Sequence, residues 1–126
     1  MKSQATPNEP FRRNPLNLQV YIDDTVIPVA LPPTLLDEAA DFFERMDRDM
    51  DEGWQMGREW VESPNRIQRC QIAANKLLGA IESGNEPLKM LMAGYILSRA
   101  PDVAAVRIDT GGEMQETELL SAESSH

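Results

Sequence analysis

The chain has few of the residues on which catalysis and metal binding most often depend. Its 126 residues include one cysteine, Cys70, and one histidine, His126. A lone cysteine excludes an intrachain disulfide and any site built from several cysteines, and a lone histidine excludes histidine-rich metal sites and disfavours a histidine-based triad. The glycine-rich phosphate-binding patterns GxGxxG and GxxxxGKS/T are also missing. We therefore expect no catalytic residue, no cofactor and no metal site.

Long apolar runs and an excess of positive charge are missing too. No apolar run approaches the roughly 18 residues that cross a bilayer, and the start, Met1 to Asn14, lacks the apolar centre of a secretory signal. The chain carries 21 Asp and Glu against 12 Lys and Arg, a formal net charge of −9, which repels phosphate backbones. These features predict a cytoplasmic protein that binds neither membranes nor nucleic acid.

The composition indicates one folded domain between two polar ends. Residues 1–15 contain Pro7, Pro10 and Pro15 among polar residues, which predicts a flexible N-terminal arm. Residues 121–126 are small and polar, which predicts a flexible tail. Residues 16–120 have a length that suits a single domain, and the chain's 41% hydrophobic and 26% charged residues are typical of a globular protein.

Apolar alternation, β-branched residues and turn residues predict strands near both ends of this domain. Leu16–Ile22 has apolar residues at every second position, as in a half-buried strand. A turn-type cluster follows, and then Val26–Leu31, in which Pro28 favours an edge strand because it cannot donate a ladder hydrogen bond. Val103–Asp109 is β-branched enough for a strand, Thr110-Gly111-Gly112 is a turn, and Glu113–Leu120 is a polar second strand. We expect an N-terminal and a C-terminal β-hairpin in a small, mainly antiparallel sheet.

The middle of the chain predicts two long helices. Thr34 suits the N-cap of a helix that can continue to Glu62, because residues 35–62 contain no proline. Ser63 and Pro64 suit the start of a second helix that ends at Ser83, before Gly84. Both stretches have apolar or small residues in alternating steps of three and four. These residues are Leu36, Ala39, Phe43, Met46, Met50, Gly53, Gly57 and Trp60 in the first helix and Ile67, Cys70, Ala74, Leu77 and Ile81 in the second.

The two apolar seams match when the chain folds back at Ser63-Pro64. Trp60 then meets Ile67, and the small residues Gly53 and Gly57 meet Ala74 and Cys70. This predicts an antiparallel αα-hairpin with closely spaced axes. Glycine inside a helix costs about 1 kcal/mol relative to alanine, and close packing is one compensation. A kink around residues 53–57 is the alternative.

A third helix completes the predicted α+β fold. Asn85 suits its N-cap and Pro87 its first turn, so we expect it to span Glu86 to Arg99. Its apolar residues recur at the spacing of an amphipathic helix. They are Leu88, Leu91, Met92, Tyr95 and Ile96.

Two features of the sequence could carry chemistry, an acidic stretch and the single cysteine. Asp47–Gly53 matches the opening of an EF-hand calcium loop only in part, because Glu52 stands where the loop needs glycine and Arg58 where it needs glutamate. A solvated helix face explains the same residues better. Cys70 lies on an apolar seam with no histidine to act as its base, which favours a buried, inert thiol.

The surplus apolar surface of the long helix indicates a binding role. Asp47, Asp49, Trp54, Met56 and Val61 lie beside its seam and form our candidate interface. Either the rest of the domain covers these apolar residues or a partner does. We expect a non-enzymatic accessory or regulatory protein that acts through protein–protein contact and self-associates through this helix. The alternative is a small-molecule or divalent-metal-binding protein whose pocket, between sheet and helices, is lined by methionines, Tyr95 and carboxylates.

Overall fold

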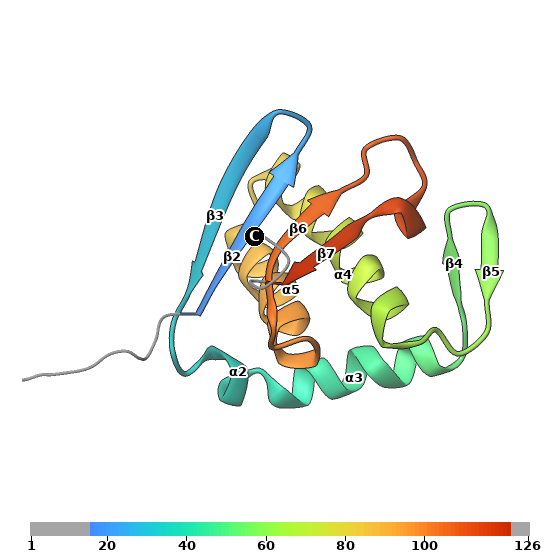
Figure 1. Ribbon diagram of the computed structural model, residues 1–126. Coiled ribbons are helices and arrows are strands. Elements are labelled where there is room, and N and C mark those ends of the chain that lie inside the picture. The colour runs from blue at the N-terminus through green and yellow to red at the C-terminus, as the bar shows by residue number, and fades with distance from the viewer. Residues whose placement is uncertain (1–15, 122–126) are drawn as a thin grey trace, which may run out of the picture.

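Four strands form the main sheet of the computed structural model, which describes residues 16–121 (Figure 1). The order across the sheet is β3-β2-β6-β7. β2 pairs with β3 and β6 with β7 in antiparallel fashion, while β2 and β6 are parallel. These strands span Leu16–Ile22 (β2), Thr25–Leu31 (β3), Val103–Ile108 (β6) and Glu118–Ser121 (β7). The predicted α+β class and both terminal hairpins are confirmed.

The strand register follows the hydrophobic alternation. Leu18 and Val20 are fully buried on one face of β2, as the period of two predicted. Pro28 lies on β3, opposite Gln19, and β3 is an edge of the sheet, where a missing ladder donor does no harm. The predicted arm, residues 1–15, lies outside the described residues. So does the predicted tail apart from Ser121, which ends β7.

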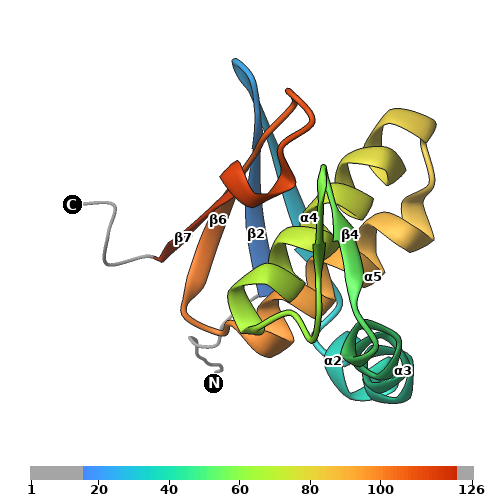
Figure 2. The same cartoon turned by 90° about the vertical axis from the view of Figure 1, so that its right-hand side faces the viewer.

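Two helices cover one face of the sheet (Figure 2). α4 spans Arg66–Ser83 and α5 spans Glu86–Arg99, and the two-residue connection makes them an antiparallel helical hairpin. The backbone at Gly84 is left-handed, with φ of 72°, and the Asn85 side chain accepts a hydrogen bond from the Leu88 N–H. The third helix therefore has the bounds and the cap that the sequence predicted.

The core lies between this helical hairpin and the sheet. Leu18 and Val106 from the sheet, Leu77 from α4 and Ile96 from α5 each have no exposed surface. Small residues let the layers approach closely: Ala73, Ala74 and Ala80 of α4 and Ala93 of α5 are also buried. Burial of this apolar surface supplies most of the drive to fold.

The predicted long helix over residues 35–62 is wrong. The segment forms two helices, α2 (Leu35–Glu38) and α3 (Ala40–Asp51), and then a separate two-stranded ribbon of β4 (Trp54–Met56) and β5 (Glu59–Val61). Figure 1 shows α3 along the lower edge of the molecule and the ribbon standing apart from the main sheet.

Glycine conformation explains why the helix ends where it does. Gly53 has φ of +107° and Gly57 has φ of +66°, values that L-residues with a side chain rarely adopt. Gly53 directs the chain out of α3, and the Trp60 ring packs on it so closely that a Cβ there would lie 2.3 Å from Trp60 Cζ2. Gly57 forms the turn between β4 and β5. The two glycines end a helix and turn a hairpin rather than lining a helical seam.

The predicted pairing of residues 35–62 with 64–83 is therefore wrong as well. Trp60 and Ile67 do not cover each other in a hairpin core, since they are 55% and 43% exposed. α4 begins at Arg66, because Asn65 and not Ser63 caps it: Asn65 and Gln68 exchange side-chain and backbone hydrogen bonds of 2.8 and 2.9 Å. The helical hairpin exists, but it joins α4 to α5.

The C-terminal hairpin also differs in detail. Where the sequence predicted a strand from Glu113 to Leu120, a 3-10 turn, η2 (Met114–Glu116), precedes the shorter β7. The buried Gln71 side chain donates hydrogen bonds of 3.0 Å to the carbonyls of Gln115 and Thr117. This polar contact from α4 holds the turn against the helical layer.

Candidate functional site

Asp47 of α3 is the centre of an ionic cluster that joins three helices. Arg99, at the end of α5, donates to its Oδ2 from Nε at 3.0 Å and from Nη2 at 2.7 Å. The Tyr95 hydroxyl donates to Oδ1, and so does Arg69 Nη1 of α4 at 3.4 Å. Each oxygen of the carboxylate thus accepts two hydrogen bonds. A partly buried charge requires such partners, because it has lost much of its hydration.

Arg69 extends the same cluster along α3. Its Nη2 donates to Asp51 Oδ1 at 2.7 Å, its Nε to the Pro64 carbonyl at 2.7 Å and its Nη1 to the Asp47 carbonyl at 3.1 Å. The Arg69 side chain is only 16% exposed, whereas that of Asp51 is 60% exposed. Arg69 therefore holds the start of α4 against α3.

The cluster shifts the pKa values of its members. Burial raises the pKa of Asp47, but the hydrogen bonds from Tyr95 and Arg99, the charge of Arg99 and the hydrogen bond from Arg69 together bring it below its ordinary value. Burial, followed by the neighbouring Asp47 carboxylate, raises the pKa of Tyr95. Asp47 is thus held ionised and Tyr95 neutral at physiological pH, so neither group is suited to exchange protons there.

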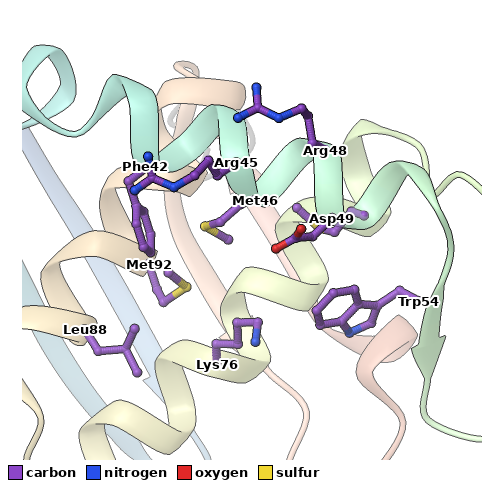
Figure 3. A pocket seen from close by; sticks show the side chains of 10 residues that line it. Phe42, Arg45, Met46, Arg48, Asp49, Trp54, Lys76, Leu88 and Met92 are labelled. Carbon is purple, nitrogen blue, oxygen red and sulfur yellow. The ribbon is translucent and has the colours of Figure 1, made fainter.

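An apolar groove lies between α3, β4 and the helical hairpin (Figure 3). It has a volume of about 420 Å³. Met50 and Met92 form its buried floor, and half-buried apolar side chains form its walls. The apolar lining residues are Phe42, Met46, Met50, Trp54, Leu88 and Met92.

Cations surround this groove although the protein is acidic. Arg45, Arg48, Lys76 and the carboxylate Asp49 complete its lining. The Arg45 guanidinium lies 5.9 Å from the Phe42 ring centroid, and Lys76 Nζ lies 5.0 Å from that of Trp54, distances at which a cation and an aromatic ring attract. In Figure 3 the side chains of Met46, Asp49 and Lys76 point into the space, and Arg48 extends away from it. Across residues 16–121 none of the three cations forms an ion pair.

The five candidate interface residues lie in different environments. Asp47 belongs to the ionic cluster, while Asp49 and Trp54 line the groove. Met56 is 2% exposed, and half-buried Val61 packs against the core. The ribbon and not a projecting helix carries Trp54, Met56 and Val61, because residues 54–61 form β4, the Gly57 turn and β5. The domain itself covers Met56, so the surface that the structure offers is the groove with Asp49 and Trp54.

Several site residues could not be identified from the sequence. Arg69, Tyr95 and Arg99 reach Asp47 across separations of 22, 48 and 52 residues. No local spacing indicates such partners. Lys76 lies over Trp54 at the groove, a contact between residues 22 positions apart that no local spacing indicates either. The methionines of the alternative hypothesis do line a pocket, but it lies among the helices and not between sheet and helices.

Metal-ligating side chains, a reactive thiol and a membrane-spanning helix are the remaining features that could indicate a function. Within residues 16–121, no group of three or more His, Cys, Asp or Glu side chains is placed to hold a metal ion. Cys70 has no exposed surface, and burial raises the pKa of its thiol to about 11, far from a reactive thiolate. In the same part of the chain no helix is both long and apolar enough to cross a bilayer.

Comparison of the chain with protein-family models, with curated proteins and with solved structures found no match.

Proposed function

We propose that this is a non-enzymatic accessory or regulatory protein that acts through protein contact, and that the groove beneath α3 is its docking surface. The observation that carries the proposal is the groove itself. Its lining holds six apolar side chains, three of them methionine, and three cations that make no ion pair in residues 16–121. Methionine side chains adapt to irregular apolar partners, and aromatic and arginine residues are enriched at protein interfaces.

The proposed occupant is an amphipathic helix of a partner protein, with acidic residues beside its apolar face. The groove follows α3 from Phe42 to Met50, a rise of about 12 Å at 1.5 Å per residue. Two apolar anchors at positions i and i+7 of a partner helix are about 10 Å apart and fit this length. Arg45 and Lys76, against the single carboxylate Asp49, favour carboxylates on the partner.

A second copy of the chain fits less well than a different protein. A symmetric dimer through this groove would bring the lining cations of both protomers into one interface. The formal net charge of −9 on each copy adds long-range repulsion. The same charge disfavours nucleic acid as the partner, and a cytoplasmic location remains part of the proposal.

Two synthetic helices provide the test. Both would carry leucines at i, i+3 and i+7, one flanked by glutamates and the other by lysines, and binding would be followed by fluorescence anisotropy at fixed ionic strength. We expect the glutamate peptide to bind at least about tenfold more tightly, because each close charge pair at a partly desolvated rim contributes on the order of 1 kcal/mol. Met46→Glu should abolish binding, since it places a carboxylate on the apolar wall.

Rim variants separate the two parts of the proposal. Arg45→Glu with Lys76→Glu should reduce or reverse the preference for the glutamate peptide. Arg58→Glu is the matched control, since Arg58 is exposed and lies outside the groove. Failure of both peptides to bind, or binding that survives Met46→Glu, would refute docking at the groove. Equal binding of both peptides would refute only the acidic character of the partner.

A small amphipathic anion is the second candidate occupant. The groove volume of about 420 Å³ falls within the range of about 300–1,000 Å³ for small-molecule sites. Saturable binding of decanoate that Met46→Glu abolishes, with no binding of either peptide, would favour this function over protein docking.

A further inference from the structure

A second hollow lies where α3, the start of α4 and the end of α5 meet. Its volume is about 490 Å³, and it shares no lining residue with the groove. Three of its seven lining residues are arginines, in a chain that has only 12 Lys and Arg against 21 Asp and Glu. The full lining is Asp47, Pro64, Arg66, Arg69, Tyr95, Ser98 and Arg99.

Two of these arginines are held in place by the ionic cluster. Asp47 accepts hydrogen bonds from both Arg69 and Arg99, whose side chains are 16% and 28% exposed. The Asp47 carboxylate thus forms ion pairs with two guanidiniums. Asp51 also pairs with Arg69, but its side chain is 60% exposed, so it neutralises the charge of Arg69 only in part. Side chains fixed in this way bind a ligand with little further loss of conformational freedom.

The third arginine has no carboxylate partner. Arg66 is exposed, and its Nη1 donates to the Arg99 backbone carbonyl at 3.2 Å. That hydrogen bond brings a third positive charge to the hollow beside Arg99, and within residues 16–121 no ion pair balances it. Three guanidiniums against Asp47 leave the lining with a formal charge of +2, opposite in sign to the protein as a whole.

The donors that remain suit an oxyanion. A guanidinium has five N–H groups. The hydrogen bonds described above use two of them on Arg99, one on Arg66 and four on Arg69. Arg99 also donates from Nη1 to Ser98 Oγ at 3.1 Å, so two N–H groups remain on Arg99, four on Arg66 and one on Arg69. The unused N–H groups of these planar forks match the geometry of phosphate oxygens and bind them at two points. The hollow also remains partly open, so a ligand can enter.

We propose that this hollow is an oxyanion-binding site for phosphate or a phosphate monoester, with Arg66, Arg69 and Arg99 as its ligands. The site is independent of the proposed docking groove, because its lining residues differ. Arg66 is the residue that tests the site, since it is exposed and does not contact Asp47, so its replacement leaves the ionic cluster intact.

The experiment is a titration followed by two-dimensional ¹H–¹⁵N NMR of the backbone and of the arginine Nε–H groups. Inorganic phosphate, phenyl phosphate and acetate would be added separately at constant ionic strength and pH 7.5. We expect saturable shifts at residues 64–69 and 95–99, with both phosphates binding more tightly than acetate. Saturation by inorganic phosphate alone would define a free-anion site, and tighter binding of phenyl phosphate a site for an esterified group.

Matched variants decide whether the binding is specific. Arg66→Gln should weaken phosphate binding about tenfold, the equivalent of one lost hydrogen bond to a charged group, and Arg66→Lys should restore part of it. Arg58→Gln removes an exposed arginine elsewhere and should change nothing. The proposal is overturned if Arg58→Gln weakens binding as much as Arg66→Gln does. Shifts that do not saturate, or acetate binding as tightly as phosphate, would also overturn it.

Discussion

Asp47→Asn is the substitution that most directly tests how α3 is attached to the helical hairpin. Asparagine keeps the shape of the side chain but removes the charge that both Arg69 and Arg99 contact. It also directs N–H donors at groups that are themselves donors. We expect the variant to fold with a lower free energy of unfolding, because two largely buried guanidiniums lose their shared partner.

The expected loss follows from the burial of the three side chains. Breaking a buried ion pair costs about 3–5 kcal/mol, whereas exposed pairs contribute about 0–1 kcal/mol. Asp47 and Arg99 are each 28% exposed and Arg69 is 16% exposed, so the value should lie between these limits, at about 2–3 kcal/mol. Asp51→Asn is the control: Asp51 is 60% exposed, and its loss should cost less than about 1 kcal/mol.

The pH dependence gives a second readout of the same cluster. The pKa of Asp47 lies below its ordinary value of 3.8 in the folded protein, so the unfolded chain takes up the proton first on acidification. The stabilisation is therefore complete at neutral pH and declines as the pH falls from about 4 through the folded pKa. The difference in unfolding free energy between wild type and Asp47→Asn should shrink over this range.

Urea unfolding followed by circular dichroism, repeated between pH 7 and pH 2.5, would measure both effects. A variant within about 0.5 kcal/mol of wild type at pH 7, the size of an ordinary surface substitution, would refute the argument that the cluster holds α3. A difference that grows on acidification would refute the assigned direction of the Asp47 pKa.

Two further predictions concern Gly53 and Cys70. Gly53→Ala should destabilise the protein by about 1–3 kcal/mol, through backbone strain and its clash with Trp60. Gly79→Ala should instead stabilise it by about 0.5–1 kcal/mol, because Gly79 is helical and a Cβ there meets nothing within 4 Å. The urea midpoints of both variants would check these values. A destabilised Gly79→Ala variant together with an unchanged Gly53→Ala variant would contradict the argument. Cys70 should react with Ellman's reagent at pH 8 only after denaturation, since the thiol is buried and its pKa is about 11; rapid labelling of the native protein would contradict this.

Elements with local signals were predictable from the sequence. β2 follows apolar alternation, β3 and β6 have β-branched sequences next to turn residues, and α5 has Asn85 before it and Pro87 in its first turn. Gly84 marks the end of α4 because only a left-handed residue can close a helix in this way. In each case the physical cause lies within a few residues of the element it determines.

The long helix was mispredicted because a heptad spacing does not specify backbone conformation. Gly53 and Gly57 satisfy the spacing, but both lie at positive φ. A signal was present: two glycines four residues apart, with Trp54, Trp60 and Val61 around them, have the composition of a short hairpin. Weighing aromatic and β-branched residues against the spacing would have favoured the ribbon.

The ionic cluster lies beyond any local rule. Asp47 and Arg99 are 52 residues apart, and their contact depends on how α3 crosses the helical hairpin. Nothing in the sequence distinguishes Asp47 from Asp49, although Asp47 joins three helices and Asp49 lines the groove. Successive residues of a helix are rotated by about 100° about its axis. Asp47 therefore faces a different set of residues from its neighbour Met46.

α3 connects the two sites, and this determines how variants should be interpreted. An isolated helix of 12 residues is marginal in water, so α3 depends on Phe43 and Met50 in the core and on Asp47 in the cluster. The same helix supplies Met46 to the wall of the groove. Asp47 variants should therefore disturb the hollow and the groove together and can assign a ligand to neither. Met46 and Arg66, each belonging to one site and absent from the cluster, can make that assignment.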